Sequence, residues 1–310
     1  MKREKKRKMT WVQFKEYIPL YLMILPGAVY LFINNYIPMT GIIVAFKKYN
    51  KAKGIYHSDW VGLDNFTYLF QRDAWTIIRN TISYNVVFLL LGTAAGIILA
   101  ILITDVASKR AKKIYQSAIM LPFLISIIIV SYIVFAFLSS ENGILNKGLL
   151  APLGLATVNW YSEPKYWPFI LVFVNLWKGC GYGTLIYIAG IAGIDGSFYE
   201  AARLDGATKW QQIKKITIPC LIPSIITLTI LGVGRIFSSD FGLFYQVPQN
   251  SGSLFDVTQT IDTYVYRSLM TMGGMGRSAA AGFFQSMVGF LLVMSVNAMV
   301  RKFSKDNAMF

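Results

Sequence analysis

The sequence is poor in the side chains that carry out chemistry. Its 310 residues include one histidine, His57, and two cysteines, Cys180 and Cys220, neither of which has a potential ligand nearby in the sequence. This composition argues against zinc, haem and disulfide scaffolds, so we predict no metal site. The 15 acidic residues are scattered, and no pair or triad stands out that would suit general acid–base catalysis. We therefore predict no catalytic residues and do not expect an enzyme.

Charged residues are also scarce, and their balance is strongly positive. They make up 15% of the chain, against about 25% in soluble proteins, and the net charge is +15. A protein that binds nucleic acid presents its basic residues on a soluble face, whereas lysine and arginine cluster here at the ends of hydrophobic runs. We attribute the charge to membrane topology and expect contact with membrane lipid, not with nucleic acid.

Hydrophobic runs, in contrast, are long and numerous. About 20 apolar residues are enough for a helix to cross a bilayer. The first run follows a basic N-terminus but is too long for a signal peptide, so we interpret it as a retained span. Asn34, Asn35 and Pro38 interrupt it, which predicts an end near Ile37, with Met39–Phe46 lying outside or packed against protein. The six predicted spans are Ile18–Phe46, Ile82–Ile103, Tyr115–Leu138, Trp167–Ile191, Cys220–Phe237 and Ala279–Val300.

Lysine and arginine are enriched in the cytoplasmic loops of membrane proteins, which allows the orientation to be predicted. The two tails and the loops after the second and fourth spans hold 18 of them, and the other three loops hold 10. Both termini are therefore predicted to be cytoplasmic. We expect an all-α integral membrane protein with a basic cytoplasmic tail, residues 1–17, and one six-helix transmembrane domain, residues 18–310.

One loop differs from the others because it is polar and patterned like helices. It covers residues 196–220, between the fourth and fifth spans. Ser197, with Glu200 three residues later, matches a capping box and predicts a helix over Phe198–Leu204. Gly206 can adopt the left-handed conformation that reverses a chain after a helix.

The second half of this loop predicts another short helix. Thr208 with Gln211 repeats the capping pattern, and Pro219 stands near the start of the fifth span, where its missing N–H costs little. A rigid helix pair fixed to two spans suits docking against a partner protein. The alternative is an amphipathic connector on the inner membrane surface, and these residues leave both open. The apolar positions of the second helix recur at a spacing of three: Trp210, Ile213 and Ile216.

The stretch EAARLDGATKWQQIKKITIP in this loop resembles the EAA signature of permease subunits in binding-protein-dependent ABC importers. That signature reads Glu-Ala-Ala, three residues, Gly, nine residues, Ile, one residue, Leu-Pro. Ile218 stands where leucine is usual, an exchange of similar volume, and Asp205 and Ala207 match a common Asp-Gly-Ala core. The residues that match in identity and spacing are Glu200, Ala201, Ala202, Gly206, Ile216 and Pro219.

The resemblance extends over nearly the whole chain. Trp60–Phe66 looks like an element common in the first outer loop of sugar permeases, and Gln259–Leu269 is similar to a subgroup associated with complex oligosaccharides. The chain most resembles permeases of multiple-sugar and oligosaccharide importers, the class that includes the maltose system. The resemblance implies a type I ABC importer permease bundle in the bacterial cell membrane, forming half of the pathway for a sugar.

The resemblance also implies partners. A second permease pairs with the first, two ATPase subunits bind ATP and magnesium beneath them, and an external solute-binding protein delivers the sugar. In this chain, Gly143–Gly148 has the glycine spacing of a phosphate-binding loop, but Leu149 and Leu150 occupy the positions that require Lys and Ser or Thr, so ATP is expected only on the partners. The residues implied to couple to the ATPase, in a loop of residues 196–219, are Glu200, Ala201, Ala202, Asp205, Gly206 and Ala207.

Two cations fall inside predicted spans. Lys178 lies near the middle of the fourth span and Arg235 within the fifth, where a charge is costly and normally faces protein or water. Both are predicted to line the substrate pathway. The alternative is snorkelling to the membrane surface or structural pairing, for Arg235 with Asp240.

Aromatic residues near these cations are candidates for stacking on a sugar ring. Because aromatic side chains in membrane helices more often pack or lie at the interface, packing is the alternative for each. Gly179, Gly181 and Gly183 beside them predict a flexible or closely packed segment. The aromatic candidates for the pathway are Trp177, Tyr182 and Phe237.

Two other functions compete with a sugar importer. A secondary transporter or channel would predict paired ionisable residues inside several spans and internal two-fold symmetry, but acidic residues are nearly absent from these spans and no repeat is found. An importer permease for a non-sugar solute is the other alternative. The sequence does not identify the cargo or the partner permease.

Overall fold

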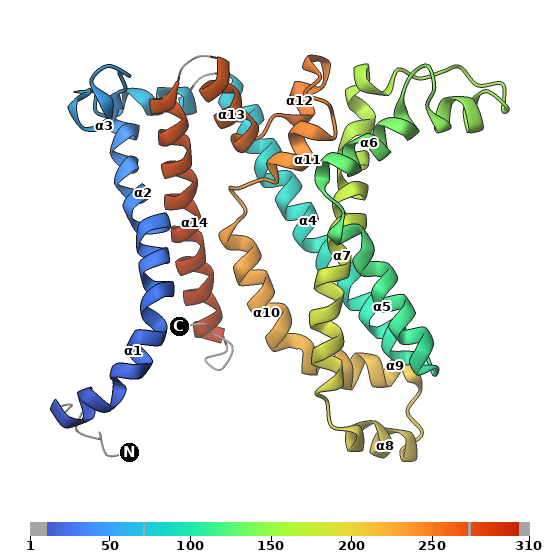
Figure 1. Cartoon of the computed structure of the whole chain (residues 1–310). Helices are drawn as coiled ribbons and strands as arrows, with labels where there is room; N and C mark the ends of the chain where they lie inside the picture. Colours follow the sequence, from blue (N-terminus) through green and yellow to red (C-terminus); the bar gives the residue numbers. More distant parts are fainter. Residues whose placement is uncertain (1–10, 71, 272–273, 304–310) are drawn as a thin grey trace.

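The computed structural model describes residues 11–70, 72–271 and 274–303, and most of them are helical (Figure 1). Five helical runs are long and apolar enough to cross a membrane, and a bent pair of helices supplies a sixth crossing if it is counted as one span. The predicted all-α, six-span architecture is confirmed. The runs are Tyr17–Phe46, Ala74–Asp105, Pro164–Ala192, Lys209–Gly234 and Met275–Lys302, with Lys109–Leu124 and Ile127–Leu138 as the bent pair. Residues 1–10 of the predicted basic tail lie outside the described residues.

The first span continues past Ile37, where the sequence predicts its end. The side chain of Asn34 donates a hydrogen bond to a carbonyl one turn earlier, so it is accommodated within the helix. Val44 and Ala45 are buried at a contact with α14 (Met275–Phe303), which confirms that this end of the run packs against protein. The span consists of α1 (Trp11–Leu31), the π-helical turn η1 (Phe32–Tyr36), α2 (Ile37–Met39) and the 3-10 segment η2 (Thr40–Phe46).

The second and fourth spans contact each other more extensively than any other pair of elements in the described residues. They are α4 (Arg72–Asp105) and α7 (Trp167–Ala192), each of which begins and ends close to or beyond its predicted bounds. Gly96 on α4 permits part of this contact, since a Cβ atom there would lie 3.1 Å from the ring of Tyr187 on α7. A small residue therefore brings the two helices together, as is usual where lipid provides no hydrophobic driving force.

The third predicted span is not one helix. α5 (Lys109–Leu124) and α6 (Ile127–Leu138) meet at an angle of 94°. The hydroxyl oxygen of Ser126 accepts a hydrogen bond from the N–H of Ile128 at the start of α6. The apolar run alone conceals this break, because hydropathy is continuous across it.

The fifth span begins earlier and ends earlier than predicted. α9 (Lys209–Gln212), the π-helical turn η7 (Ile213–Thr217) and α10 (Ile218–Gly234) form one continuous run. The sequence placed Arg235 and Phe237 inside this span, and that prediction is wrong. Both residues follow Gly234, the last residue of α10. They lie in a non-helical connection to α11 (Phe241–Gln246).

Side chains from two other helices, α4 and α14, hold this connection. Asn85 of α4 donates hydrogen bonds to the carbonyls of Ile236 and Ser238, at 3.0 and 3.1 Å. Gln285 of α14 donates to the carbonyl of Phe237 and to the carboxylate of Asp262, at 2.9 and 3.1 Å. The backbone groups released by the end of α10 are thus satisfied by protein, as an apolar environment requires.

The end of the bundle opposite α8 (Gly196–Leu204) carries short elements, including helices that the sequence did not predict (Figure 1). A two-residue antiparallel pairing joins Lys47 to Trp60 and Lys48 to Asp59. The short elements are β1 (Lys47–Lys48), α3 (Gly54–His57), β2 (Asp59–Trp60), η3 (Asp64–Phe70), η4 (Leu145–Leu150), η5 (Trp160–Ser162), η6 (Pro164–Tyr166), α11 (Phe241–Gln246), η8 (Gly252–Leu254), α12 (Phe255–Thr258) and α13 (Ile261–Thr271).

The segment Trp60–Phe66 fastens the first span to this end of the bundle. The side chain of Asn65 donates two hydrogen bonds of 2.9 Å, to the carbonyls of Ala45 and Lys47. The ring of Phe66 packs 5.5 Å from that of Phe46 and 6.2 Å from that of Phe283 on α14. The residues that resemble a sugar-permease element therefore have a structural task here.

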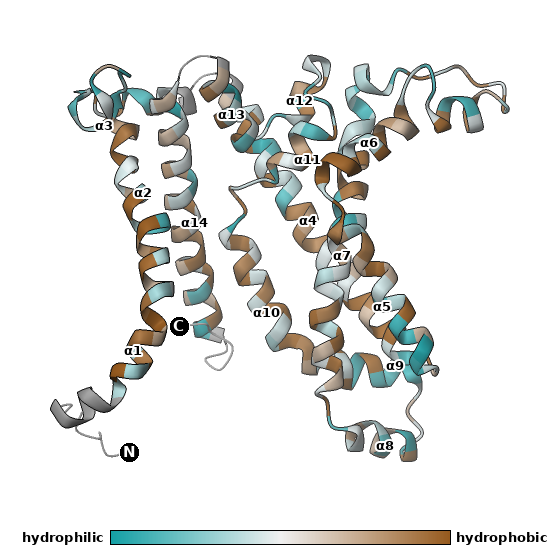
Figure 2. Cartoon of the chain, viewed as in Figure 1, coloured by the Kyte–Doolittle hydropathy of each residue, from teal (hydrophilic) through white to brown (hydrophobic). Residues whose placement is uncertain are grey.

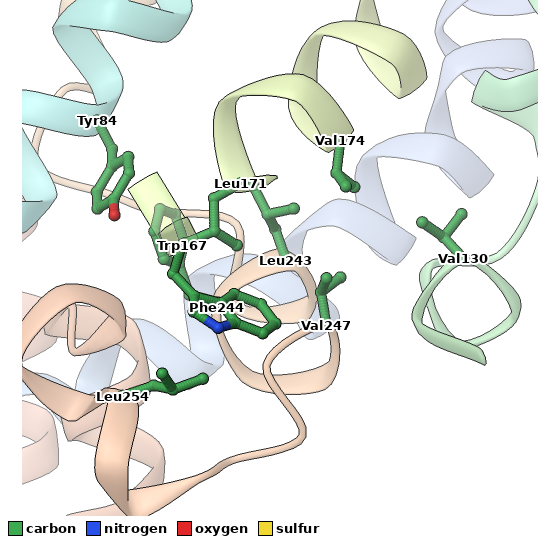
Figure 3. Packing of buried hydrophobic residues seen from close by; sticks show 9 residues of the cluster. All are labelled: Tyr84, Val130, Trp167, Leu171, Val174, Leu243, Phe244, Val247 and Leu254. Atoms are coloured by element: carbon green, nitrogen blue, oxygen red, sulfur yellow. The ribbon is translucent and has the colours of Figure 1, made fainter. Parts of the chain in front are cut away.

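The largest buried cluster of the described residues includes the start of α7 and the short helix α11 (Figure 3). Trp167 at the start of α7 is completely buried, and its indole N–H donates to the carbonyl of Trp160 at 2.7 Å. Phe244 of α11 packs 4.9 Å from the ring of Tyr84 on α4. The cluster joins four helices and η8 through Tyr84, Val130, Trp167, Leu171, Val174, Leu243, Phe244, Val247 and Leu254.

The middle of each span is apolar on its outside as well as its inside, and hydrophilic residues gather at the two ends (Figure 2). In the most apolar window of the first span no residue is buried, and in the other four long runs only 17% to 22% of residues are buried. A surface of this kind is stable against lipid or against another apolar protein surface, and not against water.

Candidate functional site

The loop of residues 196–219, which we call the coupling loop, begins with helix α8 (Gly196–Leu204). The sequence predicted Ser197 with Glu200 as a capping box, and this is wrong. The cap is Asp195, whose side-chain oxygen accepts a hydrogen bond of 3.0 Å from the backbone N–H of Ser197. This hydrogen bond lowers the pKa of Asp195, so its stabilising effect is present above the usual carboxyl pKa and is lost as the pH falls through the lowered value. Asp is a strong N-cap residue, so the sequence contained this signal.

The chain reverses after α8 at Gly206, as predicted. The φ of Gly206 is +75°, in the left-handed region that glycine adopts without strain. Its N–H donates to the carbonyl of Arg203 at 3.0 Å, and the N–H of Ala207 donates to the carbonyl of Ala202 at 2.8 Å. These two bonds form a Schellman motif, in which two otherwise unpaired helix carbonyls are satisfied.

The second half of the loop is continuous with the fifth span. Thr208 and Gln211 form the predicted capping box, with each side chain bonded to the other residue's backbone N–H. The helix that starts there passes through η7 into α10 without interruption. The second half of the loop and the fifth span are therefore one helical run.

Three contacts hold the loop against the spans. The hydroxyls of Tyr199 on α8 and Thr217 in η7 share a hydrogen bond of 2.9 Å, and Thr217 is buried. Lys209 forms an ion pair with Asp105 at the end of α4. The amide of Gln212 donates to the carbonyl of Ala207 at 3.0 Å. Tyr199 and Asp105 were not predicted, because the sequence gives no signal for partners that lie so far apart along the chain.

The side of the loop that faces away from the spans is exposed. Glu200 and Ala201 are exposed on α8, and Leu204 is 89% exposed. Phe198 and Trp210 add large exposed apolar side chains, at 57% and 70%. α8 projects from the end of the bundle beyond α7 and α9 (Figure 1). A rigid polar helix with exposed apolar and small side chains has the surface expected of a docking element.

The residues proposed from the sequence for a substrate pathway do not form one cluster. Trp177 lines an apolar cavity of about 590 Å³ between α6 and α7. Tyr182 lines a different groove of about 250 Å³ between α4, α7 and α10, with Asn175 and Thr93 as polar neighbours. Arg235 lines a third space of about 370 Å³ against α14, with Gln285.

Lys178 has a set of partners that the sequence did not suggest. Its ammonium donates hydrogen bonds to the carbonyls of Ile125, Phe123 and Pro122, at 2.6, 3.1 and 3.5 Å. In this conformation its three donors point at backbone oxygens of the neighbouring helix. This favours the structural alternative for Lys178 over a role in the pathway.

Comparison with known proteins gives consistent results. A family model described as "binding-protein-dependent transport system inner membrane component" matches residues 92–306. Protein LplB of Bacillus subtilis is 33% identical over 93% of this chain and 90% of its own length. The polygalacturonan/rhamnogalacturonan transport system permease protein YteP of the same organism is 32% identical over 98% of this chain and 94% of its own length.

A solved structure is also similar. It is a crystal structure of a bacterial alginate ABC transporter in complex with an alginate pentasaccharide-bound periplasmic protein. The matched chain is 33% identical, with a TM-score of 0.86, over 96% of this chain and 99% of that chain. The likeness therefore covers nearly the whole chain.

Proposed function

This chain belongs to the family of binding-protein-dependent transport system inner membrane components, and we propose a function on that basis. The chain is the membrane-spanning subunit of an ATP-driven importer of oligosaccharides. The observation that carries the proposal is the coupling loop: a capped, projecting helix, a tight turn, and a second helix that is continuous with the fifth span. The chain supplies a pathway and a mechanical connection, and no chemistry of its own.

The ATPase subunits are proposed to dock on the exposed side of α8. Glu200, Ala201 and Leu204 face outward there, while Tyr199 and Lys209 connect the loop to the spans. Binding of ATP and magnesium by those subunits would move α8, and the continuous run of Lys209–Gly234 would carry the movement into the membrane. Only a difference between the contacts made in two states can drive such a change. In this proposal the loop and both termini are cytoplasmic.

A second, homologous permease is proposed to cover the first span. That span contacts its own bundle mainly at η2, and its apolar window contains no buried residue. A helix that is apolar all round and stands alone is suited to contact both lipid and a neighbouring protein. Pairing would also enclose the grooves that hold Tyr182 and Arg235.

The cargo is proposed to be an oligosaccharide because of the relatives. YteP is named for transport of polygalacturonan and rhamnogalacturonan, and the similar crystal structure holds a periplasmic protein with an alginate pentasaccharide. Tyr182, exposed on its groove beside Asn175 and Thr93, offers an aromatic face and polar groups of the kind that sugars contact. Trp177, Arg235 and Phe237 remain proposals for the pathway.

ATP hydrolysis by the reconstituted complex tests this function. The chain would be purified with its native permease, ATPase and solute-binding partners and placed in lipid vesicles. We expect hydrolysis to rise several-fold when the binding protein carries an oligosaccharide, compared with the empty binding protein. Stimulation by amino acids or phosphate and by none of the oligosaccharides would contradict the proposed cargo, and absence of an ATPase from the purified complex would contradict the importer itself.

A further inference from the structure

The break between α5 and α6 is a place where backbone groups lie without their helical partners. A helix end leaves its last carbonyls unbonded, and no water is available to satisfy them in the apolar part of a bilayer. Three carbonyls at the break, from Pro122, Phe123 and Ile125, converge on one point. The carbonyl of Pro122 also accepts a hydrogen bond of 3.3 Å from the N–H of Ile125. That point is occupied by the ammonium group of Lys178.

The match between the ammonium and this site is close. A lysine ammonium has three N–H donors and no acceptor, and here it meets three acceptors. Its positive charge also lies at the C-terminal end of α5, where the helix dipole is negative. The ring of Phe123 adds a contact, with the ammonium nitrogen 5.9 Å from the ring centre. A charge placed so deep in a span is stable because every one of its donors is used.

The adjacent positions on α7 bind the same part of α5. A Cβ atom on Gly181 would lie 2.1 Å from the carbonyl oxygen of Ile119, so the two backbones touch there. The ring of Tyr182 stacks on Phe123, with centres 5.4 Å apart and planes at 18°. The spacing of Lys178, Gly181 and Tyr182 places all three on one face of α7. Together they form a joint between α7 and the end of α5.

We propose that Lys178 is a positioning residue, an internal cation that fixes the bend of the third span and thereby aims α6. The bend brings α6 across to α11, where Val130 enters the buried cluster with Leu243 and Val247 (Figure 3). Without the ammonium, the carbonyls of Phe123 and Ile125 regain partners only if the span straightens or water enters. Either change removes the contact that fixes the angle between α5 and α6, and straightening withdraws Val130 from the cluster.

This role differs from contact with cargo in what it predicts. A cargo ligand acts on the affinity for sugar and leaves the bend unchanged, whereas the positioning residue acts on the bend itself. The geometry of the bend can be measured without any sugar or ATP, so this inference can fail while the proposed function stands, and the reverse is also true.

The test uses spin labels on either side of the break in the assembled complex. Ile114 on α5 and Tyr132 on α6 are both about two-thirds exposed, at 65% and 66%, and would be replaced by labelled cysteines in a chain without Cys180 and Cys220. We expect one narrow distance distribution with Lys178. The Lys178→Met variant keeps an unbranched side chain that lacks only the terminal ammonium and so has no donor. We expect a shifted or broadened distribution and at least a tenfold loss of uptake.

Chemical rescue separates the ammonium from general packing. In Lys178→Ala, n-propylammonium supplies the atoms that the substitution removes, and tetramethylammonium supplies charge without any N–H donor. We expect n-propylammonium, and not tetramethylammonium, to restore the narrow distribution and part of the uptake. If Lys178→Met cannot be purified, recovery of folded Lys178→Ala with n-propylammonium alone gives the same answer. An unchanged distribution in Lys178→Met, or equal behaviour with both amines, would overturn the proposal.

Discussion

Substitution of Gly206 by proline is expected to reduce uptake at least about tenfold while the chain still inserts into the membrane. Proline fixes φ near −65°, whereas Gly206 has a φ of +75°. The substitution also removes the N–H that donates to the carbonyl of Arg203. Backbone strain of this kind costs about 1–3 kcal/mol of free energy. A free-energy difference of about 1.4 kcal/mol changes an equilibrium constant tenfold. We therefore expect uptake in vesicles to fall at least about tenfold, because α8 can no longer keep its position.

Gly196→Pro is the matched control for this variant. Gly196 is the first residue of α8, where proline is well tolerated because the N–H has no helical partner there. No atom lies within 4 Å of a Cβ built on either glycine, so space is not what distinguishes the two. Gly196→Pro should transport nearly normally. Uptake by Gly206→Pro at the level of Gly196→Pro would show that the turn after α8 has no part in transport.

Replacing Gly181 by alanine is expected to destabilise the bundle more than any other single added methyl group on α7. The new Cβ atom would lie 2.1 Å from a backbone oxygen and 2.8 Å from a backbone carbon of Ile119, and backbone atoms cannot move aside as a flexible side chain can. Overpacking usually costs about 1–3 kcal/mol, and a backbone clash belongs at the upper end. We expect the melting temperature of the purified complex to fall by about 6 °C or more.

Gly179→Ala and Gly183→Ala are the controls, on the same helix and two residues to either side. A Cβ atom on either of them meets nothing within 4 Å, so both variants should melt close to the unchanged protein. Equal destabilisation by all three variants would mean that this stretch needs flexibility and not a close approach. An unchanged melting temperature in Gly181→Ala would contradict the packing of α5 on α7.

Features that depend on nearby residues were predicted well. The spans follow from hydropathy, because lipid imposes a length that the sequence can be searched for. The capping box of Thr208 with Gln211 and the left-handed Gly206 were both correct, since each is set by residues within one or two turns. At α8 the same reasoning predicted Ser197 as the cap, whereas the cap is Asp195, two residues earlier.

Features that depend on distant residues were missed. The 94° bend needs Lys178, more than fifty residues further along the chain, to satisfy its carbonyls, and the hydrophobic run does not change there. The end of α10 before Arg235 is likewise set by Asn85 and Gln285 on other helices. The helices α11 to α13 are short and contain polar residues, so hydropathy gives no sign of them.

The candidate site shows the same contrast between features set by nearby residues and features set by distant residues. The coupling loop was predicted because its signature is local and because the family resemblance gave it a role. The pathway residues were chosen for chemical type alone, and the structure places Trp177, Tyr182 and Arg235 in three separate spaces. A pathway formed between two subunits leaves little trace in one chain.

Labelling of Ala201→Cys tests the central claim most directly. Ala201 is exposed on α8, and the chain used would lack Cys180 and Cys220. The account predicts that a membrane-impermeant maleimide labels this cysteine in inside-out vesicles and not in right-side-out vesicles. It also predicts that a short cross-linker joins the cysteine to a co-purifying ATPase subunit. Labelling from the outer face, or a purified complex in which no ATPase can be cross-linked, would contradict it.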